Sequence, residues 1–257
     1  MEAVEDTGTR LAYEDRGTGS PVVFIHGLTF SKETWRPIID RLVDRYRCVA
    51  IDLPGHGESA GLPRSMDEVT RRVHRLITDL GIERPVIVGH SYGAIFATFY
   101  AAQMPVAGVV NVDQTLLVGP VIGMSQQMEP LLRGPSFAAA FEPIRGSIGV
   151  DMLPEPLRSS TLATQTVRQD LVVAYWYELG RPSPEEMQAQ VDEAAGKIKV
   201  PYLAIFGQRL PEEDRAYLQR HLAALQLEEW AERGHMVHLR ETERFTNRVT
   251  RFIDSLR

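Results

Sequence analysis

Ser91 lies between two glycines in the segment IVGHSYGAIF, residues 87–96, directly after a short apolar run. A serine hydroxyl acts as a nucleophile when a sharp strand-to-helix turn exposes it and a nearby base takes its proton. The run before Ser91 is typical of a strand, and the Ala-, Phe- and Tyr-rich segment after it is typical of a helix. Gly89 and Gly93 would relieve clashes around such a turn. These residues predict a catalytic nucleophile at Ser91.

The proton acceptor for Ser91 must come from the seven histidines of the chain. His235 stands in ERGHMVH, after the strand-like residues 225–230 and before an amphipathic segment at the C-terminal end. A histidine on such a loop can reach over the edge of the sheet that carries Ser91. His238, three residues later, is the alternative, and its surroundings are more typical of a packed or exposed residue. We therefore expect His235 to be the general base.

Strands must position these side chains, and five short apolar runs end in glycine or a polar residue: residues 21–27, 48–55, 85–90, 107–113 and 201–207. Runs that are apolar at nearly every position are typical of parallel strands covered on both faces. Helical patterns lie between them, one of which begins with a capping box formed by Ser65 and Glu68. The alternation predicts a doubly wound, mostly parallel α/β sheet.

The alternation stops between residues 114 and 195. Residues 116–158 are rich in Met, Pro, Gly and Leu and contain no convincing strand. Two helix-like segments follow, residues 160–180 and 183–198. We interpret this region as an inserted helical cap over residues 114–195, and the remainder as one core formed by residues 1–113 and 196–257.

Composition limits the classes of partner. The 257 residues are 44% hydrophobic and 24% charged, with a formal net charge of −6, which is typical of a soluble protein and disfavours nucleic acid as a partner. Cys48 is the single cysteine, so no intramolecular disulfide can form, and a reducing compartment is indicated. The acidic N-terminus lacks the apolar core of a signal peptide, and no window approaches a membrane span. We expect a cytoplasmic protein with a small-molecule substrate and no membrane partner; the sequence is compatible with a homodimer.

Four segments in this order resemble the α/β-hydrolase family, and the resemblance covers nearly the whole chain: FIHGLTFSKETW, AIDLPGHGES, GHSYG and GHMVHLRETERF. The resemblance implies an α/β-hydrolase fold. It also implies an oxyanion hole made by the backbone N–H groups of Leu28, in the His-Gly loop, and Tyr92, after the nucleophile. Two preorganised N–H dipoles can stabilise the charge of a tetrahedral intermediate. We interpret the DLPGHGES segment as architectural.

The resemblance leaves two places for the acid that orients His235. The family usually carries this acid a few residues after the glycine that ends the penultimate strand, where this chain has Leu210 and Pro211. Some members carry it one strand earlier, where Asp113 ends the run AGVVNVD. We expect Asp113 to be the acid. The alternative is one of three acidic residues with the pattern of a helix's first turn, Glu212, Glu213 and Asp214.

The substrate pocket should lie beneath the cap. The candidate lining residues are His26, Met124, Met128, Leu131, Leu132, Phe137, Phe141, Tyr175, Trp176 and Tyr177. Pockets for small molecules are mostly apolar, so these residues favour an apolar substrate. Methionines and aromatics at helical spacing also form cores, and a cap needs a core of its own.

These residues predict a serine hydrolase that cleaves an ester or lactone of a mainly apolar small molecule through an acyl-enzyme, without cofactor or metal. Ser91 disfavours dehalogenase and epoxide hydrolase chemistry, which uses an aspartate nucleophile. C–C bond hydrolysis belongs to the same class and stays open. Two other functions remain alternatives: a cofactor-independent dioxygenase on the same fold, and a ligand receptor that hydrolyses slowly and signals through its cap.

Overall fold

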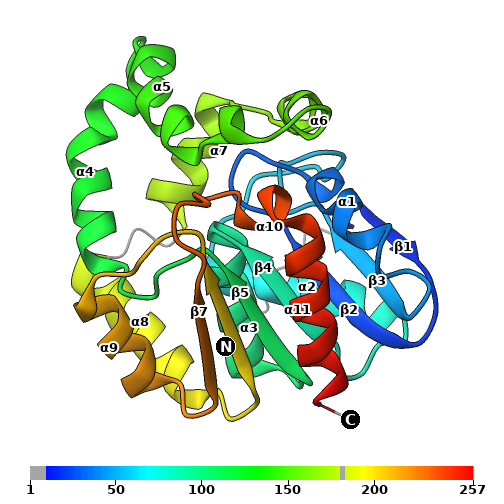
Figure 1. The fold of residues 1–257 in the computed structure, drawn as a ribbon. Helices are drawn as coiled ribbons and strands as arrows, with labels where there is room; N and C mark the ends of the chain where they lie inside the picture. The colour runs from blue at the N-terminus through cyan, green and yellow to red at the C-terminus, as the bar shows by residue number, and fades with distance from the viewer. Residues whose placement is uncertain (1–9, 180–182, 257) are drawn as a thin grey trace.

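The computed structural model describes residues 10–179 and 183–256 (Figure 1). The expectation that no signal peptide is present rests largely on residues 1–9, which lie outside the described residues. Seven strands form one sheet in the order β1-β3-β2-β4-β5-β6-β7. All neighbouring pairs are parallel except β1 and β3. The predicted fold class, a mostly parallel α/β sheet, is confirmed.

The strands are β1 (Tyr13–Arg16), β2 (Ser20–Ile25), β3 (Tyr46–Ile51), β4 (Val86–His90), β5 (Gly108–Val112), β6 (Tyr202–Phe206) and β7 (Leu225–Glu229). The five apolar runs form β2 to β6, and residues 225–230 contribute β7. Strand β1 was not expected. Its residues YEDR alternate between exposed and half-buried at the edge of the sheet, so they show no apolar run.

The helices are α1 (Arg36–Ile39), α2 (Met66–Asp79), α3 (Tyr92–Gln103), α4 (Gly119–Arg133), α5 (Phe137–Ile148), α6 (Leu157–Thr164), α7 (Gln169–Val173), α8 (Pro184–Lys197), α9 (Glu212–His221), α10 (Val237–Arg240) and α11 (Thr242–Asp254). Short helical turns lie at Lys32–Trp35, Val150–Met152 and Ala174–Glu178. The Ser65 hydroxyl accepts a hydrogen bond from the N–H of Glu68 at 3.1 Å and caps α2. The Glu68 carboxylate accepts from the N–H of Arg64 instead of Ser65, so the predicted capping box is only half formed.

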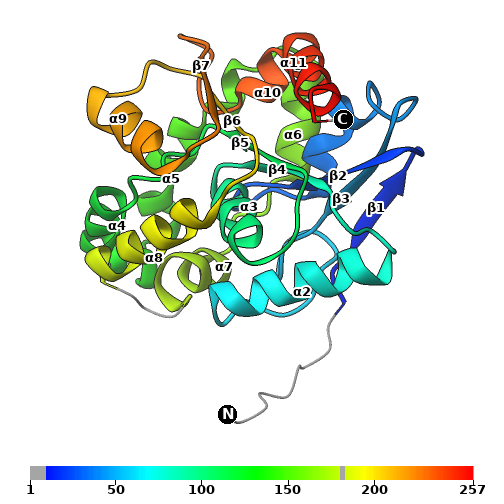
Figure 2. The same ribbon diagram turned by 90° about the horizontal axis from the view of Figure 1, so that it is seen from below.

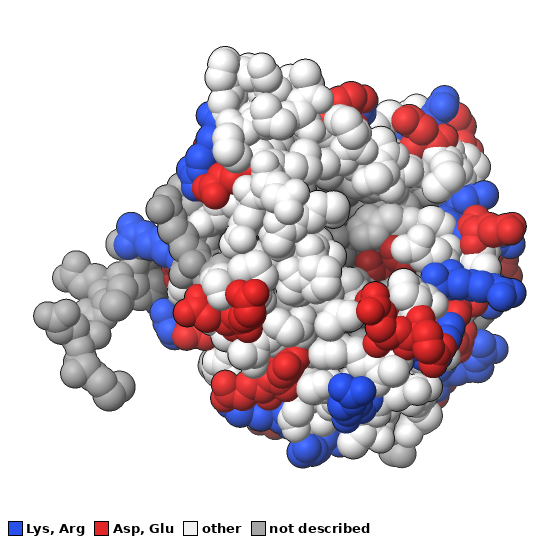
Figure 3. Space-filling view, turned by 90° about the vertical axis from the view of Figure 1, so that its left-hand side faces the viewer, with Lys and Arg blue, Asp and Glu red and all other residues white. Residues whose placement is uncertain are grey.

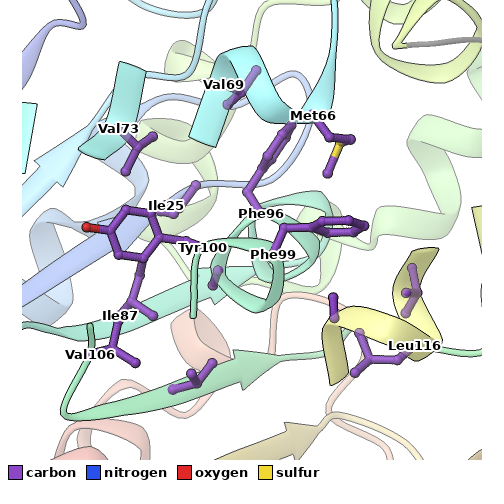
Figure 4. Packing of buried hydrophobic residues seen from close by; sticks show 14 of the residues in the cluster. Ile25, Met66, Val69, Val73, Ile87, Phe96, Phe99, Tyr100, Val106 and Leu116 are labelled. Carbon is purple, nitrogen blue, oxygen red and sulfur yellow. The ribbon is translucent and has the colours of Figure 1, made fainter. Parts of the chain in front are cut away.

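Helices cover both faces of the sheet. Figure 2 shows α2, α3 and α8 on one side and α10 and α11 on the other. On the first side, Phe96, Phe99 and Tyr100 of α3 belong to one apolar cluster with strand residues such as Ile25 and Ile87 and with Val69 of α2 (Figure 4). On the second side, Trp35 joins residues of α11 against the opposite face of the strands. Two apolar layers therefore bury the central strands completely, which explains their continuous apolar runs.

The region between β5 and β6 is helical in its described residues. Helices α4 to α7 lie above the carboxyl edge of the sheet, where Figure 1 shows them as a separate group. Helix α8 differs, because Met187, Val191 and Ala195 pack into the layer formed by α3. Helix α8 also contacts the cap, because the side-chain oxygen of Gln188 accepts from the N–H of Gly119 in α4 at 3.0 Å, so the expected cap boundary at residue 195 stays a prediction. No described helix combines the length and apolar character needed to cross a bilayer.

Candidate active site

Ser91 occupies a strained turn between β4, which ends at His90, and α3, which begins at Tyr92. Its backbone has φ of 52° and ψ of −128°, a conformation that non-glycine residues rarely adopt. Its N–H donates to the carbonyl of Val112 at 2.9 Å, so the neighbouring strand holds the turn. A Cβ at Gly93 would lie 2.4 Å from the carbonyl oxygen of Ile25. Glycine at this position therefore lets α3 begin against β2 and keeps Ser91 at the edge of the sheet.

Asp113 and His235 come from segments 122 residues apart and form a hydrogen bond. Asp113 follows β5 with φ of 54° and is almost fully buried. Its Oδ2 lies 2.7 Å from Nδ1 of His235. Because a carboxylate only accepts hydrogen bonds, Nδ1 carries the proton and Nε2 is left as the basic nitrogen. This is the tautomer that can accept a proton from a serine hydroxyl.

Gly207, at the end of β6, holds both members of this pair. Its N–H donates to Oδ1 of Asp113 at 2.6 Å. Its carbonyl accepts from the N–H groups of Arg233 at 2.8 Å and Gly234 at 2.9 Å, immediately before His235. Any side chain at Gly207 would collide with the backbone of Gly234, at 1.9 Å from its carbonyl oxygen. The end of β6, where most relatives were expected to carry the acid, here supplies a backbone clamp.

The three alternative acids make other contacts. Glu212 pairs with Arg215, and Asp214 accepts a hydrogen bond from the hydroxyl of Thr115. Glu213 is exposed in the first turn of α9. The structure therefore brings Asp113, and none of these three, to His235.

The two expected oxyanion donors flank Ser91. A Cβ placed on Gly27 would lie 3.1 Å from Cβ of Ser91, so the His-Gly loop closely approaches Ser91. Leu28 follows in that loop and lines the same cavity as Ser91 and Tyr92. The N–H of Tyr92 lies in the first turn of α3, where helical N–H groups have no partner within the helix. The arrangement leaves both amides able to donate to a substrate oxygen.

Two buried histidines hold the His-Gly loop in place. Nε2 of His26 accepts from the N–H of Leu53 at 3.0 Å, and Nε2 of His56 accepts from the N–H of Thr29 at 3.1 Å. Each ring donates through Nδ1 to a nearby carbonyl. Burial lowers the pKa of His26 to about 4 and keeps the pKa of His56 well below its usual range. Both rings are neutral at pH 7 and connect the loop to the segment after β3, in agreement with the architectural interpretation of DLPGHGES.

His90 supports the loop that carries His235, and nothing in the sequence indicated this contact. Its Nε2 lies 3.0 Å from the carbonyl oxygen of His235 and donates to it. His238 is fully buried, with its ring centroid 4.5 Å from that of His90. Burial lowers the pKa of His238 to about 3. His238 is therefore a neutral core residue.

A cavity of about 960 Å³ lies between this site and the cap. Ser91, Tyr92, Leu28, Asp113 and His235 line its floor. Six of the expected pocket residues also line it: Met124, Met128, Phe141, Tyr175, Trp176 and Tyr177. They share the walls with further apolar residues of the cap and of α8, among them Ile122, Ile144 and Met187.

Four expected pocket residues lie elsewhere, which corrects the prediction. His26 is buried, and its side chain supports the His-Gly loop as described above. Leu132 is fully buried in the core of the cap, and Phe137 packs against the same cluster. Leu131 is 56% exposed on the outer face of α4. Helix α4 is apolar on more than one face, so its sequence did not show which face meets the cavity.

Comparison with known proteins shows the family of the chain. The family model of the alpha/beta hydrolase family matches residues 22–248. The chain belongs to the α/β-hydrolase family. A putative non-heme haloperoxidase of Mycobacterium phage D29 is 34% identical over 111 residues, 41% of this chain and 40% of that protein. The chain spans between 30% and 64% of the length of three curated relatives that it matches.

Solved structures share the fold along nearly the whole chain. An esterase from Thermogutta terrifontis has a TM-score of 0.75 at 21% identity, covering 96% of this chain and 93% of its own. The enol-lactonase from Burkholderia xenovorans LB400 has a TM-score of 0.73 at 22% identity, covering 96% of this chain and 98% of its own. At these identities the likeness concerns the fold, so the chemistry must be argued from the site.

Proposed function

We propose that this α/β-hydrolase is a serine hydrolase that cleaves esters or lactones of mainly apolar small molecules through an acyl-enzyme. One observation carries the proposal. Ser91 shares a cavity with His235, whose Nδ1 is held by Asp113, and with the amides of Leu28 and Tyr92. This set contains a nucleophile, an oriented base and an oxyanion hole.

The reaction follows from these positions. Oγ of Ser91 attacks the substrate carbonyl carbon while Nε2 of His235 takes the hydroxyl proton. The amides of Leu28 and Tyr92 donate to the oxyanion that forms. The intermediate expels the alcohol, which receives the proton from His235, and leaves an ester on Ser91. His235 then deprotonates a water that attacks this ester, and the second intermediate releases the acid as Oγ of Ser91 takes the proton back from His235.

Asp113 supports both steps without exchanging a proton. Its carboxylate keeps the proton of His235 on Nδ1 and stabilises the imidazolium that forms in each step. The names of the two structural neighbours above, an esterase and an enol-lactonase, make ester and lactone carbonyls the first classes to test.

Hydrolysis of p-nitrophenyl acetate and p-nitrophenyl hexanoate tests the proposal. We expect Ser91→Ala to lose at least 99% of the wild-type kcat. The matched control is Ser160→Ala, whose hydroxyl lies on exposed α6 and donates to the carbonyl of Leu157. Retention of more than a tenth of kcat in Ser91→Ala would contradict the nucleophile assignment. Oxygen uptake with a heterocyclic substrate would favour the dioxygenase, and binding without turnover would favour the receptor.

A further inference from the structure

The charges that line the cavity are all acidic in the described part of the chain. Asp113 and Glu129 line it, and none of the described lining residues is lysine or arginine. Glu129 forms an ion pair with Arg133 at 2.6 Å, and Arg133 is not among the lining residues. The remaining titratable base, His235, is held by Asp113. A bound anion would therefore find no countercharge on these walls.

Most hydroxyl groups of the cavity wall donate to the protein itself, although Thr29, Gln126 and Gln208 add further polar side chains to the wall. The Tyr92 hydroxyl donates to the carbonyl of Tyr175 at 2.7 Å, and the Tyr177 hydroxyl donates to the carbonyl of Ser125 at 2.7 Å. The Tyr175 hydroxyl donates to the carbonyl of Pro54 at 2.9 Å. The lining serines donate to carbonyls of their own helices, Ser125 to Ile122 and Ser147 to Ile144. These donors are not free to solvate an anion.

Apolar side chains form most of the remaining wall. Five methionines line the cavity together with isoleucines, valines and aromatics: Met66, Met124, Met128, Met152 and Met187. Figure 3 shows the face that carries α4 and α5, where charged side chains lie to either side of an upper middle area that has none. Val121 and Met124 lie on α4, line the cavity and are 49% and 61% exposed. The apolar character therefore extends from the cavity wall to the surface.

We propose that the substrate is neutral in both its acyl and its leaving group, and that esters or lactones bearing a carboxylate or phosphate are rejected. This inference rests on the proposed function and specifies its substrate class. A carboxylate or phosphate on the substrate would lose its hydration in a mostly apolar cavity without gaining a cation, which is strongly unfavourable. It would also approach the carboxylate of Asp113. The oxyanion hole does not compensate, because its donors are used by the reacting oxygen.

A matched set of three substrates tests this inference: p-nitrophenyl hexanoate, the mono-p-nitrophenyl ester of adipic acid and its methyl ester. The second substrate replaces the terminal methyl group of the first by a carboxylate, and the third restores neutrality at similar length. We expect kcat/KM for the carboxylate substrate to be at least about 100-fold lower than for hexanoate. The neutral methyl ester should lie within about 10-fold of hexanoate. Equal kcat/KM for the carboxylate substrate and for hexanoate would overturn the inference.

A cation introduced into the wall gives a second test. Met128 is half-buried on the cavity wall, so Met128→Lys should raise kcat/KM for the carboxylate substrate by at least about 10-fold and lower it for hexanoate. Leu162→Lys is the control, because Leu162 is 37% exposed on α6 and is not among the lining residues. A folded Met128→Lys protein with unchanged preference, checked by circular dichroism, would count against the inference.

The two proposals fail in different ways. If no ester is hydrolysed in a Ser91-dependent manner, the proposed function is wrong. If all three esters are hydrolysed at similar rates and Ser91→Ala abolishes each activity, the hydrolase stands and the neutral-substrate inference is overturned.

Discussion

Replacing Asp113 by asparagine changes hydrogen-bond chemistry while leaving the shape of the site almost unchanged. Oδ1 of Asp113 accepts the N–H of Gly207 at 2.6 Å, and only the oxygen of an asparagine can take over that bond. The new NH₂ group would then face Nδ1 of His235, at the position where Oδ2 now lies 2.7 Å away. Two donors cannot share this contact, so His235 must carry its proton on Nε2. In that tautomer it cannot accept the proton of Ser91.

The expected loss is large because nearly every molecule holds the wrong tautomer. The same substitution in a Ser-His-Asp site lowers kcat about 10⁴-fold, which corresponds to about 5.4 kcal/mol in the barrier. We expect kcat for p-nitrophenyl hexanoate to fall by about three to four orders of magnitude in Asp113→Asn. The thermal midpoint should change little, since the bond to Gly207 and the side-chain volume are kept.

The matched control is a triple variant in which the three alternative acids are replaced by their amides: Glu212→Gln, Glu213→Gln and Asp214→Asn. This variant should keep kcat within a few-fold of wild type, because none of the three contacts His235. The reasoning is refuted if Asp113→Asn keeps more than a tenth of kcat, or if the triple variant loses as much as Asp113→Asn.

Three further predictions concern the supports of the site. Gly93→Ala should lower the free energy of unfolding by about 1–3 kcal/mol, because its Cβ would lie 2.4 Å from a backbone oxygen. The thermal midpoint should fall accordingly. Gly196→Ala, with open space around its Cβ, should be neutral or stabilising; an equal loss in both would contradict the close approach of α3 to β2. His56→Ala should lower kcat at least about 10-fold by releasing the N–H of Thr29, and His56→Gln should recover much of it by offering an acceptor oxygen; identical kcat in both variants would argue against that bond. Burial lowers the pKa of His238 to about 3, so the unfolded chain binds the extra proton first, and stability falls by about 1.4 kcal/mol per pH unit as the pH drops from about 6.5 towards 3. His238→Phe should remove this contribution and gain about 2 kcal/mol over wild type on going from pH 7 to pH 5 in urea titrations; parallel pH profiles would show that His238 does not contribute.

The fold could be predicted because its determinants are local in sequence. The parallel strands are buried on both faces, so each appears as an uninterrupted apolar run. The start of α2 is indicated by Ser65, whose hydroxyl caps the helix. Strand β1 could not be found in this way, because an edge strand with half-exposed side chains has no apolar run.

The turn at Ser91 could be predicted, because its residue types depend on the local backbone conformation. Contacts between segments that are far apart in the sequence could not be predicted in this way. The glycines around Ser91 indicate a strained turn, and the turn is present. The hydrogen bonds of Gly207 are made by backbone atoms, so the sequence carries no sign of them beyond the glycine that the close approach of Gly234 requires. The pocket prediction erred at Leu132 because apolar residues lie on several faces of α4, and only packing decides which face meets the cavity.

Covalent labelling tests the central claim most directly. The protein is incubated with a p-nitrophenyl phosphonate ester carrying an apolar chain, and the modified peptide is located by mass spectrometry. The account predicts a single adduct on Ser91, lost in Ser91→Ala and formed at least about 100-fold more slowly in His235→Ala, since the uncharged hydroxyl is a poor nucleophile. No adduct on Ser91 in folded wild-type protein, or labelling of another residue at the same rate in Ser91→Ala, would contradict it.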